Sequence, residues 1–125
     1  MHKNYIVKYF LKFQSLLSLE KDFLKKILTT AIKIKKISPG NKVIIFGNGG
    51  SSSIASHFTV DLVKNTKIQC LNFSDAALIT CFANDYGYEN WTAKALDIYG
   101  KKGDVVILIS SSGMSKNILK AASTS

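Results

Sequence analysis

Two short segments of the sequence combine glycine with serine in a way that suits anion binding. The segments are "GNGGSSS" at residues 47–53 and "SSSGMS" at residues 110–115. Glycine lets the backbone approach a ligand, serine supplies hydroxyl donors, and the start of a helix supplies unpaired N–H groups and a positive dipole end. Together these features predict a phosphate site built without arginine. The alternative for each segment alone is a glycine turn followed by an ordinary serine N-cap.

His57 and Asp61 form a second group with chemical potential. They are four residues apart and therefore share one face of a helix. A carboxylate beside an imidazole can transfer protons, and the same pair can supply two ligands to a metal such as zinc. At about 1.5 Å per residue, Asp61 lies roughly 12 to 15 Å along the helix from the glycine segment. The alternative is an ordinary polar helix face.

The elements that position these groups follow from the apolar pattern. Residues 43–46 and 105–109 are short, apolar and rich in β-branched residues, which is typical of buried parallel strands, and residues 68–73 form a third such run. Helical patterns cover residues 52–64, 75–83 and 91–99 and begin again near residue 115. Residues 4–37 have apolar positions at helical spacing and predict one long helix or two helices broken near residues 15–18.

Strands that alternate with helices predict an α/β protein with a doubly wound parallel sheet. If the strand order is the flavodoxin-like 2-1-3, the first and third strands are neighbours. Both glycine–serine segments then leave the carboxyl edge of the sheet beside one crevice, which is where open parallel sheets bind ligands. This arrangement would bring two serine-rich helix starts to one phosphate group.

The charge of the chain is concentrated near its N-terminus. All 17 basic residues are lysines, against 8 acidic residues. Ten of the lysines lie in residues 1–42 with only two acids, so this part carries 10 − 2 = +8 of the net +9. Lysines between apolar residues at helical spacing favour a solvated helix face over a nucleic-acid surface, and arginine, the usual residue for bidentate phosphate contacts, is absent. We therefore expect no nucleic-acid partner.

Several other classes of site fit poorly. The chain has no dinucleotide G-x-G-x-x-G fingerprint, no nucleotide P-loop and no G-x-S-x-G nucleophile motif. Cys70 and Cys81 lack disulfide-framework or zinc-ligand spacing. No apolar run is long enough for a membrane span, and lysines interrupt the N-terminal stretch. The expectation is a cytoplasmic protein that binds a small phosphorylated metabolite and no membrane.

Three stretches resemble the sugar isomerase (SIS) domain family, and within it the phosphoheptose isomerases. They are "GNGGSSSIASHFTVDL" (47–62), "SDAALITCFANDYGYENW" (74–91) and "GDVVILISSSGMSKNI" (103–118), in the family's order and spacing. The resemblance implies a flavodoxin-like fold, a homotetramer with N-terminal helical contacts, and sugar-phosphate binding. It also implies interconversion of sedoheptulose 7-phosphate and a manno-heptose 7-phosphate for the synthesis of surface polysaccharides such as lipopolysaccharide or capsule.

The resemblance also assigns roles to residues. It implies that Ser110, Ser112 and Ser115 hold the phosphate with help from Ser51, and that Asn48 and Asp85 line the sugar. With their neighbours in the same segments, the expected substrate-binding residues are Asn48, Gly49, Gly50, Ser51, Asn84, Asp85, Ser110, Ser111, Ser112 and Ser115. The implied catalytic residues are Asp61, as the base, and His57. The same two residues match positions that bind zinc in some members of the family.

The chain departs from this family in two places. Asp61 stands where phosphoheptose isomerases usually carry glutamate, and the chain stops inside the helix after the third strand. The resemblance therefore implies an N-terminal helical segment at residues 1–39 and an SIS domain at residues 40–125 that is incomplete at its C-terminus and inactive by itself. A non-catalytic SIS module that binds a sugar phosphate or a regulatory partner is the alternative. Tyr86, Tyr88 and Trp91 either line the sugar pocket or belong to the core.

Overall fold

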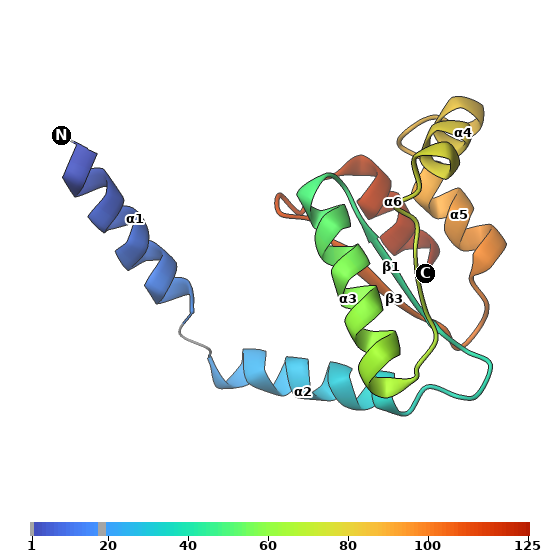
Figure 1. Cartoon of the computed structure of the whole chain (residues 1–125), viewed down its shortest axis with the longest axis horizontal. Helices are drawn as coiled ribbons and strands as arrows, with labels where there is room; N and C mark the ends of the chain where they lie inside the picture. The colour runs from blue at the N-terminus through green and yellow to red at the C-terminus, as the bar shows by residue number, and fades with distance from the viewer. Residues whose placement is uncertain (1, 18–19) are drawn as a thin grey trace. The chain divides into compact units, whose positions relative to one another are not determined.

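The computed structural model describes residues 2–17 and 20–125, with side chains from residue 4 onward (Figure 1). The chain divides into two compact units, Met1–Lys33 and Ile34–Ser125. The expected domain boundary at residue 40 lies further along the chain than this division, because Ile34 belongs to the core of the second unit.

Two helices form the N-terminal part. Helix α1 spans His2–Leu16 and helix α2 spans Lys21–Lys35. Of the two expected arrangements, one long helix or two helices, the structure therefore has two helices. Part of the expected break falls on residues 18 and 19, which lie outside the described residues. Both helices expose many large apolar side chains, among them those of Tyr5, Phe10, Leu16, Phe23 and Leu28.

The second unit is built on a three-stranded parallel sheet. Strand β1 spans Val43–Gly47, β2 spans Cys70–Asn72 and β3 spans Val105–Ile109, in the order β2-β1-β3. This is the flavodoxin-like order that the resemblance implies and on which the expected crevice depends. Strand β2 is shorter than the expected run 68–73 because the chain is still turning after α3: Lys67 is left-handed with φ 63°, and the Ile68 N–H bonds to the Thr66 hydroxyl.

Helices cover both faces of the sheet, as Figure 1 shows. Helix α3 (Gly50–Thr66) lies on one face, and α4 (Ala76–Tyr86), α5 (Trp91–Tyr99) and α6 (Lys116–Thr124) contribute to the other. Because side chains alternate along a strand, Val43 and Ile45 of β1 join the first core, while Ile44 and Phe46 join the second. The doubly wound α/β architecture is thereby confirmed.

Aromatic residues form the centre of the second core. The Phe46 ring stacks on Phe73 with centroids 5.1 Å apart and meets Trp91 edge-on at 5.9 Å. Trp91 is fully buried, so of its two predicted roles it takes the one in the core. Tyr86 meets Phe82 edge-on. None of the helices in the described ranges is both long and apolar enough to cross a membrane.

Candidate functional site

The two glycine–serine segments leave the sheet side by side. The last residue pair of the β1·β3 ladder joins Gly47 to Ile109, so Asn48 and Ser110 are the next residues at one edge of the sheet. Each segment leads into a helix, α3 after the first and α6 after the second. The tertiary structure therefore brings together two helix starts that are more than 60 residues apart in the sequence.

The glycine segment packs tightly against its own helix. A Cβ atom on Gly47 would lie 2.5 Å from the backbone carbon and oxygen of Ser51, so only glycine allows the first turn of α3 to approach the end of β1. Gly49 precedes the helix with φ 52°, and its carbonyl accepts from the N–H groups of Ser52 and Ser53. A Cβ on Gly49 or Gly50 would meet no atom within 4 Å, so the backbone there is open on its outer side.

Three hydroxyl groups converge in the second segment. The Ser110 Oγ lies 3.5 Å from the Ser112 Oγ and 3.3 Å from the Ser115 Oγ. Ser110 and Ser112 also accept from the N–H groups of Gly113 and Met114, both at 3.1 Å. An oxygen that accepts from an N–H keeps its own O–H proton to donate. Since good O–H···O bonds measure about 2.7 to 2.8 Å, these long contacts leave the hydroxyls able to turn towards a shared anion.

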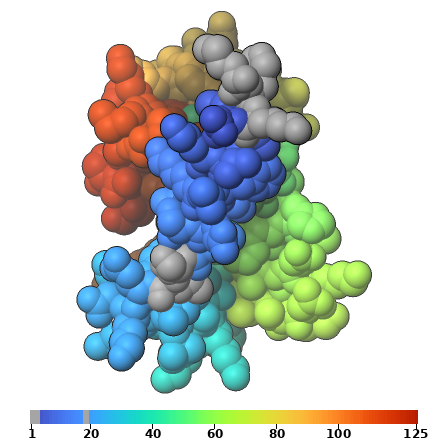
Figure 2. All heavy atoms as spheres, turned by 90° about the vertical axis from the view of Figure 1, so that its left-hand side faces the viewer, coloured from blue at the N-terminus to red at the C-terminus, as the bar shows by residue number. Residues whose placement is uncertain are grey.

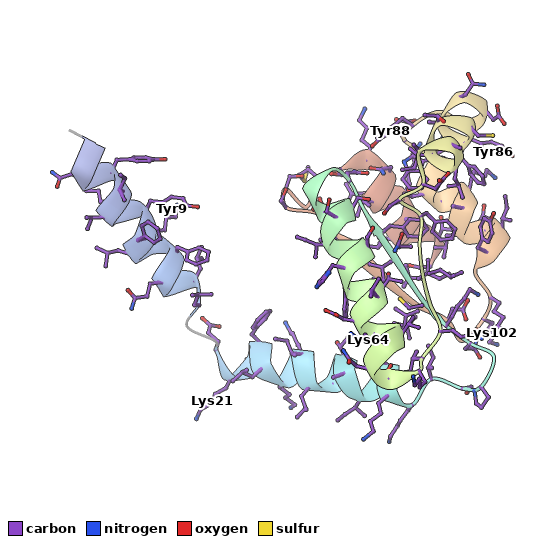
Figure 3. The ribbon with its side chains drawn as sticks, in the orientation of Figure 1. Tyr9, Lys21, Lys64, Tyr86, Tyr88 and Lys102 are labelled. Atoms are coloured by element: carbon purple, nitrogen blue, oxygen red, sulfur yellow. The ribbon has the colours of Figure 1, made fainter. Side chains whose placement is uncertain are left out.

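Asn48 is held by a residue that the sequence analysis did not single out. The side chain of Asn48 exchanges two hydrogen bonds with the side chain of Asn117, each of 2.9 Å. Tyr88, labelled in Figure 3 in the segment between α4 and α5, donates to Asn48 Oδ1 at 3.3 Å. Asn117 lies one helical turn before the buried Ala121, so the two residues share the buried face of α6. A polar residue at a position where the helical pattern expects an apolar one was the signal that could have identified it.

These residues border an open cavity of about 500 Å³. Its lining consists of Asn48, Tyr88, Glu89, Ser115, Lys116 and Asn117. Lys116 supplies positive charge in the first turn of α6. The hydrogen bond from Lys120 to Glu89, of 2.8 Å, together with the charges of Lys120 and Lys116, lowers the pKa of Glu89. The cavity therefore offers amide, hydroxyl and cationic donors together.

Of the other serines near the two segments, some are hydrogen-bonded to each other and some are not. Ser52 and Ser56 share hydrogen bonds of 2.7 and 3.0 Å with the Ser74 hydroxyl, beyond the end of β2. Ser51 is half-buried, and Ser111 is exposed. Within the described residues, neither Ser51 nor Ser111 uses its hydroxyl in a hydrogen bond.

Asn84 and Asp85 lie at the end of α4 and are exposed. The Asn84 amide donates to Asp85 Oδ1 at 3.0 Å, and the Cys81 thiol donates to Asp85 Oδ2 at 3.7 Å. No hydrogen bond in the described part of the chain joins either residue to the serine segment. Their place beside the cavity therefore stays a prediction from the resemblance.

His57 and Asp61 lie apart from this cavity. The His57 Nε2 is 3.4 Å from Asp61 Oδ2, and the two side chains are 80% and 53% exposed. Ala55 and Leu62 turn towards the sheet, and His57 is about 200° around the helix from Ala55. Figure 2 shows α3, in green, with its outer side chains at the molecular surface.

A zinc ion would need more than this pair. Structural zinc has four ligands and catalytic zinc usually has three from the protein. Among the side chains of residues 4–17 and 20–125, no three from His, Cys, Asp or Glu are grouped as a metal site. The described residues therefore do not fit a complete zinc centre.

The chain is similar to known proteins over most of its length. The family model of the SIS domain matches residues 8–125. The chain is 38% identical over 129 residues to a phosphoheptose isomerase of Helicobacter pylori, which covers 97% of this chain and 67% of the relative. It is 43% identical over 94 residues to a phosphoheptose isomerase of Thermodesulfovibrio yellowstonii, covering 70% of this chain and 46% of the relative.

Solved structures show the same fold. The phosphoheptose isomerase of Neisseria gonorrhoeae superposes with a TM-score of 0.86 at 24% identity, over 99% of this chain and 68% of the other. The phosphoheptose isomerase of Francisella tularensis superposes with a TM-score of 0.81 at 29% identity, over 99% of this chain and 69% of the other. The chain spans between 46% and 67% of the length of the two curated relatives. With its family model covering nearly the whole sequence, the chain belongs to the SIS domain family.

Proposed function

We propose that the protein is a sugar-phosphate isomerase of the phosphoheptose isomerase type. Its substrate would be sedoheptulose 7-phosphate, converted to a manno-heptose 7-phosphate for surface polysaccharide precursors. The observation that supports this most directly is the convergence of the Ser110, Ser112 and Ser115 hydroxyls beside Asn48 at the carboxyl edge of the sheet. The similarity to phosphoheptose isomerases supports the choice of reaction.

The serine segment would bind the phosphate group. Its three hydroxyls can each donate one hydrogen bond to a phosphate oxygen, and the N-terminus of α6 directly follows them. Ser51, whose hydroxyl forms no hydrogen bond in the described structure, would add a donor from the start of α3. The sugar would then extend along the cavity past Asn48, and Asp85 would approach it from the end of α4.

The reaction moves a proton between neighbouring carbons. A base removes a proton from C1 of the ketose while the C2 carbonyl oxygen gains one, which forms an enediol. The proton on the C1 oxygen then leaves as a proton returns to C2, and the aldose results. We assign the base to Asp61, with His57 3.4 Å away to exchange protons with it.

Asp61 lies eleven residues after Gly50, about 16 Å along the axis of α3 at 1.5 Å per residue, on the side facing away from the sheet. Asp61 can therefore reach a bound sugar phosphate only if another chain or segment holds the ligand against this outer face of α3. We therefore also propose a homotetramer. The exposed apolar side chains of α1 and α2 support it, because a large exposed apolar surface marks an interaction site.

The outward position of Asp61 also favours a second candidate function. A non-catalytic SIS module would bind a sugar phosphate or a protein partner through the serine segment and would not need a carboxylate in the cavity.

We propose no nucleic-acid partner, because the chain lacks arginine. We propose the cytoplasm as its compartment, because Cys70 and Cys81 are unpaired thiols.

One experiment separates these functions. The complete protein and its Asp61→Asn variant are incubated with sedoheptulose 7-phosphate and with shorter ketose phosphates, and isomerisation is followed by NMR. Turnover of sedoheptulose 7-phosphate by the wild type alone supports the isomerase. Tight binding of a sugar phosphate without turnover supports the module, and the absence of both binding and turnover contradicts both proposals.

A further inference from the structure

Asn117 is a buried polar residue without a place in the chemistry described above. Its side chain is only 2% exposed, in the first turn of α6. Its Nδ2 donates to Asn48 Oδ1 and its Oδ1 accepts from Asn48 Nδ2, both at 2.9 Å. Because the two bonds are reciprocal, neither amide can turn by 180° alone without facing oxygen to oxygen and nitrogen to nitrogen.

This amide pair links the two loops of the site. Asn48 follows β1 and Asn117 comes two residues after Ser115, so the pair crosses the crevice between the strand exits. Within the described parts of the chain, no other hydrogen bond joins residues 48–53 to residues 110–117. The β1·β3 ladder ends at Gly47 and Ile109, so beyond that point the hydrogen bonds of the sheet no longer set the distance between the loops.

Two other elements anchor the pair. The Thr92 hydroxyl of α5 donates to the Asn117 backbone oxygen at 2.6 Å, and Thr92 is fully buried. The Tyr88 hydroxyl donates to Asn48 Oδ1 at 3.3 Å. Asn117 is therefore fixed at its backbone by α5. The Asn48 backbone oxygen accepts from the Ser51 N–H at 3.0 Å, and the Asn48 side chain is held by Asn117 and Tyr88.

The hydrogen-bond count gives Asn48 a defined role. Its Oδ1 accepts from Asn117 and Tyr88, which uses both lone pairs of a carbonyl oxygen. Its Nδ2 carries two protons, and Asn117 takes one of them. One N–H remains beside a cavity that Asn48 lines. In this arrangement Asn48 presents a donor and no acceptor.

We propose that Asn117 is a positioning residue: it holds the Asn48 amide as a hydrogen-bond donor to an oxygen of the bound sugar and keeps the two loops at a constant separation. The inference rests on the proposed function, because it takes the ligand to be a sugar phosphate. Asn117 also borders the cavity, but it is only 2% exposed, and we take it to act through Asn48.

The first test needs no ligand. Hydrogen exchange of the Asn48 side-chain amide is measured by NMR in the wild-type protein and in the Asn117→Ala variant, with exposed Asn65 as the internal reference. The expected result is exchange at least about tenfold slower for Asn48 than for Asn65 in the wild type, and loss of this protection in the variant. Equal exchange of Asn48 and Asn65 in the wild type overturns the inference, even if the variant does not fold.

The second test asks whether Asn117 acts through Asn48. Affinities for sedoheptulose 7-phosphate and for inorganic phosphate are measured by calorimetry for Asn48→Ala, Asn117→Ala and the double variant, with Asn65→Ala as the matched control. Each single variant should bind the sugar phosphate about tenfold more weakly, with a smaller change for inorganic phosphate, which the serines hold. The double variant should be no weaker than Asn48→Ala, because the two residues act as one unit.

Other outcomes have distinct meanings. Losses that multiply in the double variant show that Asn117 does not act through Asn48 and overturn the inference. An equal loss for inorganic phosphate points to a general structural role and also overturns it. If the wild type binds no sugar phosphate, the proposed function fails, and the exchange measurement alone decides whether Asn117 fixes the Asn48 side chain.

Discussion

Lys42 and Asp104 form an ion pair with Nζ and Oδ2 2.6 Å apart, and the Asp104 side chain is only 3% exposed. The same carboxylate accepts from the Asn41 side chain and from the backbone N–H groups of Lys42 and Lys101, each at 3.0 Å. Lys42 directly precedes β1 and Asp104 directly precedes β3. The pair therefore joins the two strands at the end of the sheet opposite the candidate site, where Figure 3 labels the neighbouring Lys102.

This carboxylate makes stability depend on pH. Burial by itself raises the pKa of Asp104, but the hydrogen bonds from Lys42, Asn41 and the backbone outweigh burial and lower it from 3.8 to about 2. Each pKa unit corresponds to about 1.4 kcal/mol, so the ionised group contributes about 2 kcal/mol to the free energy of unfolding. That contribution is complete above about pH 4 and is lost as the pH falls towards 2. Urea unfolding at a series of pH values between 2 and 5 measures it.

Replacing Asp104 by asparagine should remove this dependence. Asp104→Asn leaves the Lys42 ammonium without its counter-ion in a largely buried position, and we expect a loss of about 3 kcal/mol at pH 7. Asp97→Asn is the matched control, since Asp97 pairs with Lys94 at 3.5 Å with both side chains about half exposed. The control should change stability by less than about 1 kcal/mol. Equal effects of the two substitutions would contradict the role given to Asp104.

Gly47→Ala should destabilise the protein and disturb the glycine segment. The added Cβ would lie 2.5 Å from the Ser51 backbone, so the first turn of α3 must move, at a cost of about 1 to 3 kcal/mol. Gly50→Ala is the control, because its Cβ meets nothing within 4 Å and alanine favours the helix. Thermal unfolding should show a lower melting temperature for the first variant and an equal or higher one for the second. A melting temperature unchanged by Gly47→Ala would show that the close approach is not needed.

Ser110→Ala should weaken phosphate binding. It removes the central hydroxyl of the three and the acceptor for the Gly113 N–H. A hydrogen bond to a charged group contributes about 1.5 to 3 kcal/mol, so affinity for a sugar phosphate should fall by roughly 10- to 100-fold in calorimetry. Ser53→Ala is the control, since Ser53 is exposed in the first turn of α3. If both serine variants bind like the wild type, the phosphate lies elsewhere.

Asp61→Glu tests the base in the proposed reaction. The resemblance to phosphoheptose isomerases implies glutamate at this position, so this variant should keep or increase turnover. Asp61→Asn should lower kcat by about 10² to 10⁴-fold while substrate affinity and melting temperature change little, because the side chain is 53% exposed. NMR measurement of isomerisation checks both variants. Full activity of Asp61→Asn would move the role of base to another residue.

The sequence alone was sufficient for the fold class and for most element boundaries. Residues 43–46 and 105–109 are apolar and mostly β-branched, and the helices between them have strong periodicity, so local pattern and tertiary packing favour the same structure. The 2-1-3 strand order was a condition that the flavodoxin-like resemblance implied, because right-handed crossovers also allow other orders such as 1-2-3. Strand β2 was the weakest prediction, because its start depends on the turn at Lys67.

The candidate site was predictable only in part. Glycine and serine at strand exits predict a phosphate site from local chemistry, and the family resemblance points to Ser110, Ser112 and Ser115 within it. The structure brings these three hydroxyls together, and their phosphate role stays a prediction. The contact of Asn48 with Asn117 joins residues 69 positions apart, and only the pairing of β1 with β3 brings them together. Asp61 shows the reverse: helical spacing places it beside His57, but only the packing of Ala55 and Leu62 on the sheet decides that this pair faces outward.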